Sequence, residues 1–174
     1  MSMDAIVEGG NWAEPGGREA AAVILRFLAD IGVPVALGSA EGEGAVLPGL
    51  AFREGTLIVD PATPAYPGDL LHEAGHYAVT EPEGRDALSD PGSDPAKEMA
   101  AMAWSAAAAM ACGVPMDVLF HEHGYKGNAQ NLAMQFGTGN GPGVPMLAWY
   151  GMTAEVHRGT PELPGYPVMQ RWLR

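Results

Sequence analysis

Glycine and proline set the first limit on what this chain can fold into, because 24 glycines and 15 prolines occur among its 174 residues. Proline interrupts helices and central strands, and glycine weakens both. We therefore expect short elements joined by many turns rather than a bundle of long helices. Hydrophobic residues make up 47% of the chain, which is enough for a core. The length predicts one domain covering residues 1–174, with a proline-rich tail from about residue 160 that Trp172 anchors.

The charge balance argues against several classes of protein. Nine Lys and Arg residues against 21 Asp and Glu residues leave a formal net charge of −12, which disfavours binding to a phosphate backbone. The single cysteine, Cys112, cannot form an internal disulfide. The acidic start, 1–4, does not resemble a signal peptide, and the uncharged stretch 99–116 is too rich in alanine for a membrane span. We expect a cytoplasmic protein that binds neither nucleic acid nor membrane, and the sequence assigns no oligomeric state.

Helix and strand signals both occur along the chain and predict an α+β fold. Apolar spacing and end signals predict helices over residues 16–31, 69–79, 94–112, 128–136 and 145–150. Asp69 is expected to cap the second of these helices, and Asp94 followed by Pro95 to start the third. The runs 49–52 and 56–59 flank a short turn and predict a β-hairpin.

The strongest single signal is His72-Glu73-Ala74-Gly75-His76, which matches H-E-x-x-H on a segment expected to be helical. Residues four apart lie on one face of a helix, so both imidazoles can reach the same ion. Glu73 is rotated around the helix axis, where it can act on a water without binding the metal itself. The motif predicts a zinc site with His72 and His76 as ligands and Glu73 as the general base.

A hydrolytic zinc site needs a third protein ligand. The extended motif with a further histidine is excluded, because Val79 and Pro82 occupy its glycine and histidine positions. Glu98, in the first turn of the next expected helix, is our candidate, since the small residues that follow it let two helices approach closely. The competing carboxylates are Asp94, Glu81 and Glu83. Asp94 is better explained as a helix cap, and the other two as solvated loop charge.

These motifs resemble those of the zincin metallopeptidases of the gluzincin group. The order of features is more narrowly similar to the minimal ImmA/IrrE-type domains, which have an N-terminal helix, a short strand region, a helix with L-x-H-E-x-G-H and a helix with a ligand glutamate. The matching stretches here are Leu70–His76 and Glu98–Ala103. The resemblance implies a small zincin-like α+β domain and a metal-dependent peptidase, which in some members of the family acts on a repressor partner.

Peptide hydrolysis also builds up negative charge on an oxygen, which a nearby donor can stabilise. The candidate donors are His121, His123 and Tyr125, and His157 is a further candidate. Because His121 and His123 are two residues apart, they do not share a helix face, so a second metal site is not expected. The expected function is a zinc-dependent hydrolase, most simply a metallopeptidase, whose peptide or protein substrate adds to a strand edge in the region 50–59. The alternative is a non-catalytic regulatory or interaction module that uses the same metal site structurally.

Overall fold

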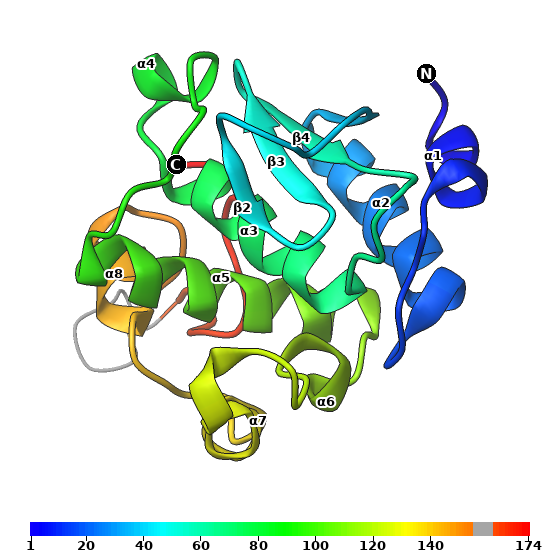
Figure 1. Ribbon diagram of the computed structural model, residues 1–174. Helices are drawn as coiled ribbons and strands as arrows, with labels where there is room; N and C mark the ends of the chain where they lie inside the picture. Colours follow the sequence, from blue (N-terminus) through cyan, green and yellow to red (C-terminus); the bar gives the residue numbers. More distant parts are fainter. Residues whose placement is uncertain (155–161) are drawn as a thin grey trace.

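The fold is α+β, as the sequence predicts, and combines eight described helices with a small mixed sheet (Figure 1). The computed structural model describes residues 1–154 and 162–174. Its helices are α1 Met3–Gly9, α2 Gly17–Ile31, α3 Pro67–Val79, α4 Pro82–Arg85, α5 Pro95–Cys112, α6 Met116–Leu119, α7 Ala129–Gly137 and α8 Val144–Trp149, with a 3₁₀ turn over Tyr125–Gly127. The helix α3 lies between the sheet and α5 (Figure 1).

The sheet consists of four strands in the order β1-β4-β3-β2. Their bounds are β1 Val35–Leu37, β2 Ala45–Leu47, β3 Leu50–Arg53 and β4 Thr56–Val59. The strand β1 pairs with β4 in parallel, and the other two pairs are antiparallel. The expected hairpin is confirmed as β3 and β4, whereas β2 had no clear signal in the sequence. The prediction that the region 50–59 offers a free edge is wrong, because β3 and β4 are the two inner strands.

End signals explain where the two central helices begin and end. The carboxylate of Asp94 accepts a hydrogen bond from the backbone N–H of Ala96 at 2.9 Å, and Gly113 ends α5 with a left-handed φ of 77°. The expected start of α3 was two residues too late. The helix begins at Pro67, because the first turn of a helix does not need the backbone N–H that proline lacks. Asp69 therefore lies inside the first turn and is not the cap.

The C-terminal segment 162–174 packs against the two central helices. The Trp172 ring meets Phe27 edge-on with centroids 4.9 Å apart, and its carbonyl accepts a hydrogen bond from the indole N–H of buried Trp104 at 2.8 Å. The backbone N–H of Arg174 donates to the carbonyl of Ala78 at the end of α3. Trp172 therefore anchors the segment, as expected. None of the described helices combines the length and apolar character that crossing a bilayer requires.

The approach of α3 to α5 brings the two halves of the candidate site together. A Cβ atom built on Gly75 would lie 2.7 Å from the carbonyl oxygen of Ala101, closer than real side-chain contacts allow. Ala100, Ala101 and Ala103 on α5 are fully buried. Glycine on one helix and alanines on the other therefore let the backbones meet, which brings Glu98 over the histidines of α3.

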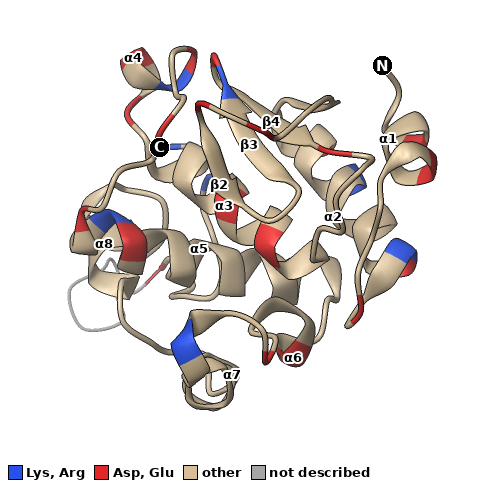
Figure 2. Ribbon diagram, viewed as in Figure 1, with Lys and Arg blue, Asp and Glu red and all other residues tan. Residues whose placement is uncertain are grey.

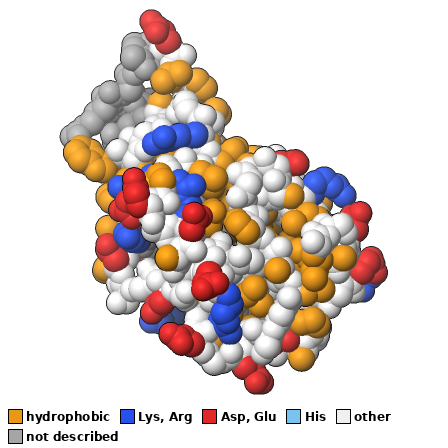
Figure 3. Space-filling model, turned by 90° about the horizontal axis from the view of Figure 1, so that it is seen from above, with side chains coloured by type: hydrophobic (Ala, Val, Ile, Leu, Met, Phe, Trp, Pro, Cys, Tyr) orange, Lys and Arg blue, Asp and Glu red, His pale blue; other side chains and the backbone are white. Residues whose placement is uncertain are grey.

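Charged residues are spread over the molecule. On the face seen in Figure 3, Lys and Arg side chains lie among Asp and Glu side chains and do not gather into a patch. With a formal net charge of −12, this distribution supports the expectation that the chain does not bind nucleic acid. That expectation stays a prediction.

Candidate metal centre

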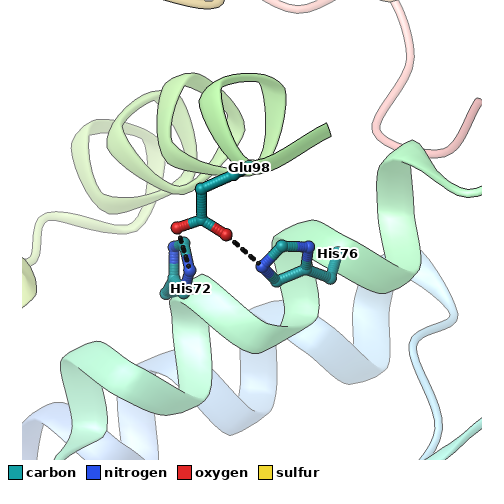
Figure 4. Close-up of side chains that lie close together, drawn as sticks. All are labelled: His72, His76 and Glu98. Atoms are coloured by element: carbon teal, nitrogen blue, oxygen red, sulfur yellow. Dashed lines mark ion pairs between the residues drawn. The ribbon is translucent and has the colours of Figure 1, made fainter. Parts of the chain in front are cut away.

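Three side chains from α3 and α5 converge on one point. His72 and His76 project from one face of α3, and Glu98 reaches them from the first turn of α5 (Figure 4). The Nε2 atom of His72 lies 3.2 Å from one carboxylate oxygen of Glu98, and the Nε2 atom of His76 lies 3.0 Å from the other. The candidate ligand atoms all lie within 4.8 Å of one another.

The donor set and its spacing fit a divalent metal ion. In a tetrahedral zinc site with bonds near 2.0–2.2 Å, neighbouring ligand atoms lie about 3.3–3.5 Å apart, and the two nitrogen–oxygen distances here are close to this range. Two imidazole nitrogens and one carboxylate leave a fourth position open, as catalytic zinc sites require. The His72, His76 and Glu98 group can therefore hold a metal ion. Imidazole and carboxylate donors suit several divalent metal ions, zinc among them.

His72 and Glu98 shift each other's pKa values in the direction that favours their charged forms. Hydrogen bonds from both histidines hold the pKa of Glu98 far below its ordinary value. Burial by itself would lower the pKa of His72, but its hydrogen bond to Glu98 and the charge of Glu73 raise that pKa above the usual value. A bound cation would take over the role of the histidine protons, since both the protons and the cation favour an ionised Glu98.

Glu73 lies beside the three candidate ligands without joining them. The residue is 4% exposed, and its Oε2 atom is buried with no hydrogen-bond partner among the described residues. Burial raises the pKa of Glu73 above its ordinary value, although His72 and His76 oppose the shift. A carboxylate with a raised pKa, and with an oxygen that has no hydrogen-bond partner among the described residues, is suited to accept a proton from a water in the pocket.

The candidate site opens into a pocket of about 360 Å³. Its walls are the strand β2, the loop 90–92 and Tyr125, and its floor carries the residues of the α3 motif together with Asp69. Among the described residues, α3 carries no Lys or Arg (Figure 2), and the lining of this pocket contains none either. The pocket is therefore strongly acidic apart from its histidines.

Of the three candidate donors for the transition state, Tyr125 is the one that lines this pocket. Its ring lies 5.8 Å from that of His72 at 79°, and its buried hydroxyl has no hydrogen-bond partner among the described residues. Burial raises the pKa of Tyr125, so the phenol keeps its proton. Tyr125 and Lys126 both have left-handed backbones, with φ of 58° and 52°. Such strain in two non-glycine residues is typical of functional sites.

The remaining histidines occupy other places. His121 is buried, and its Nε2 atom lies 2.7 Å from Oδ1 of Asp69. His123 lies 3.5 Å from Glu122 and lines a neighbouring pocket. His157 lies outside the described residues. A second metal-binding group is not found among the described residues.

The competing carboxylates do not join the three candidate ligands. Asp94 caps α5, and Glu81 pairs with Arg174 at 2.9 Å and with Lys97 at 3.5 Å. Glu83 is exposed on the short helix α4.

Sequence reasoning missed two parts of the site. The strand β2 is only three residues long and follows the loop 38–44, so no periodic signal marks it. Asp69 was interpreted as a cap, although its spacing of three and four residues before His72 and Glu73 places it on the same helix face. That spacing is the signal that could have placed Asp69 in the pocket.

The site can also be compared with known proteins. A scan against protein-family models and searches of curated proteins and of solved structures found no match to this chain. The resemblance to zincins therefore stays a prediction that depends on the residues of the site.

Proposed function

We propose that this protein is a zinc-dependent hydrolase, most simply a metallopeptidase. One observation carries the proposal: His72, His76 and Glu98 converge on one point in an open pocket, and the unpartnered carboxylate oxygen of Glu73 lies beside them. A buried carboxylate without a partner is costly to maintain in a folded protein. Its presence next to a three-ligand group supports a catalytic use of the site.

The roles of the side chains follow from their positions. Zinc bound in this site would polarise a substrate carbonyl and lower the pKa of a water. Glu73 accepts the proton of the attacking water and passes it to the leaving amine, because its raised pKa suits both transfers. His72, His76 and Glu98 hold the ion.

Tyr125 is our candidate for the donor that stabilises the developing oxyanion. It is the only one of His121, His123 and Tyr125 that lines the pocket among the described residues, and its hydroxyl is free to donate. His121 donates to Asp69, and His123 lies in a neighbouring pocket.

The open strand edge supports a proposal for the class of substrate. The strand β1 packs against α1, whereas β2 ends the sheet on the side where it lines the pocket. An extended peptide could add to β2 by backbone hydrogen bonds and so pass the metal ligands. This supports a peptide or unfolded protein segment as substrate.

Two variants separate metal binding from catalysis. Glu98→Ala removes one of three ligands and should lower zinc retention, whereas Glu73→Gln should leave zinc bound and abolish peptide cleavage. Metal content is measured by elemental analysis of protein purified without chelators, with His72→Ala as the reference for a lost site. A Glu98→Ala variant with full zinc affinity would refute the ligand assignment.

The same experiment tests the alternative, a non-catalytic metal-binding module. Among the described residues of the C-terminal segment, none lines the pocket, so nothing described there blocks access to it. Stoichiometric zinc without cleavage of any peptide in a broad unstructured library would favour the alternative.

A further inference from the structure

Asp69 places a second carboxylate in the pocket, one helical turn before the general base. It precedes His72 by three residues and Glu73 by four, so the three side chains share one face of α3 and line the same pocket. Four residues of helix correspond to about 6 Å along the axis. The carboxylate of Asp69 therefore belongs to the same pocket wall as Glu73, and β2 lines that pocket too.

His121 orients this carboxylate. Its Nε2 atom lies 2.7 Å from Oδ1 of Asp69, and its ring stacks on that of Tyr66 with centroids 4.1 Å apart. Both members of the pair are buried, with Asp69 5% and His121 2% exposed. A carboxylate that merely complements the helix dipole is normally solvated and needs no such support.

His121 is the one basic side chain that contacts Asp69 among the described residues. The Nδ1 atom of His121 is buried and has no hydrogen-bond partner among the described residues. The contact to Asp69 is therefore the single side-chain hydrogen bond that holds the ring of His121 among the described residues. Among the described residues, Asp69 has no Lys or Arg partner.

The pocket around Asp69 suits a cation brought by the substrate. Tyr125 adds an aromatic wall to the same pocket, and carboxylate and ring together bind guanidinium or ammonium groups well. No basic residue lines the pocket among those described, and Asp90 adds a further negative charge at the rim.

We propose that Asp69, held by His121, is a specificity-determining residue that selects peptides with an arginine or lysine side chain beside the scissile bond. This inference rests on the proposed peptidase function and names its substrate class. The side chain donates hydrogen bonds to the free oxygen of Asp69 while the peptide backbone follows β2.

Binding of uncut peptides tests the inference without relying on turnover. The zinc-loaded Glu73→Gln protein is titrated with three peptides that differ only at one central residue, which is arginine, its neutral isostere citrulline, or glutamate. We expect the arginine peptide to bind at least about tenfold more tightly than the citrulline peptide, because it can form one charge-assisted hydrogen bond that citrulline cannot. The glutamate peptide should bind most weakly.

Two further substitutions in the same background locate the effect. Asp69→Asn should remove the preference for arginine while keeping the contact to His121. Asp30→Asn is the matched control, since it removes the same charge from an exposed residue of α2 that does not line the pocket. It should keep most of the preference. Zinc content and thermal unfolding of each variant verify that it is folded.

The outcomes are distinguishable. Equal binding of the arginine and citrulline peptides to the Glu73→Gln protein would overturn the inference and leave the peptidase proposal standing. A preference that survives Asp69→Asn, or that Asp30→Asn reduces equally, would also overturn it. If no peptide binds, the proposed function fails, and the specificity of Asp69 fails with it.

Discussion

The substitution Gly75→Ala tests whether the close approach of α3 to α5 builds the metal centre. The added Cβ atom would lie 2.7 Å from the carbonyl oxygen of Ala101, whereas ordinary contact begins near 3.4 Å. Both atoms belong to the backbone framework of buried helices, so neither can turn aside. The two helices must therefore separate locally by roughly 0.7 Å, the difference between those distances.

Such a separation should harm the metal site more than the fold. Overpacking costs about 1–3 kcal/mol, and the better helix propensity of alanine returns about 1 kcal/mol, so the free energy of unfolding should fall by about 0–2 kcal/mol. Metal–ligand distances tolerate shifts of only about 0.2 Å. Moving Glu98 away from His72 and His76 should therefore weaken zinc binding at least about tenfold, as loss of support around ligands does.

Competition with a chromophoric chelator measures the zinc affinity, and thermal unfolding of the metal-free protein measures stability. Gly137→Ala on α7 is the control, because nothing lies within 4 Å of a Cβ atom at that helical position. The control should keep the zinc affinity and change stability by less than about 1 kcal/mol. If Gly75→Ala binds zinc as tightly as the unmodified protein, the close approach does not position Glu98, and this reasoning is refuted.

Two further predictions concern the scaffold. Trp104→Ala should lower the free energy of unfolding by about 3–5 kcal/mol, because it empties a fully buried indole site and removes the hydrogen bond to the Trp172 carbonyl. Denaturant unfolding measures this loss of stability. A loss below about 1 kcal/mol would contradict the anchoring role of Trp172. Hydrogen bonds from the backbone N–H groups of Ala40 and Ala62 lower the pKa of Asp60. Its contribution to stability is therefore present above the unfolded pKa of about 3.9 and lost as the pH falls through the lower folded pKa. The melting-temperature deficit of Asp60→Asn should be largest near pH 7 and shrink below about pH 4, and a deficit that is constant over this range would show that the charge is irrelevant.

Local signals in the sequence were sufficient to predict the elements that carry the candidate ligands. The helix of His72 and His76, the cap and proline that start α5, and the hairpin of β3 and β4 all depend on residues within a few positions of one another. Capping, proline geometry and helical spacing act over that range, so these elements could be predicted without tertiary contacts. The H-E-x-x-H spacing likewise indicated one face of one helix and its two imidazoles.

Only the tertiary structure decided which distant groups meet that face. Glu98 joins the histidines because Gly75 allows α5 to approach, and His121 supports Asp69 across 52 residues of sequence. The open edge belongs to β2, not to the hairpin, because strand order depends on how β1 pairs with β4. Such contacts depend on how whole helices and strands pack together, and the sequence next to each residue does not predict them. The sequence by itself therefore determined the motif and its helix, whereas packing of the helices and the sheet determined the pocket around them.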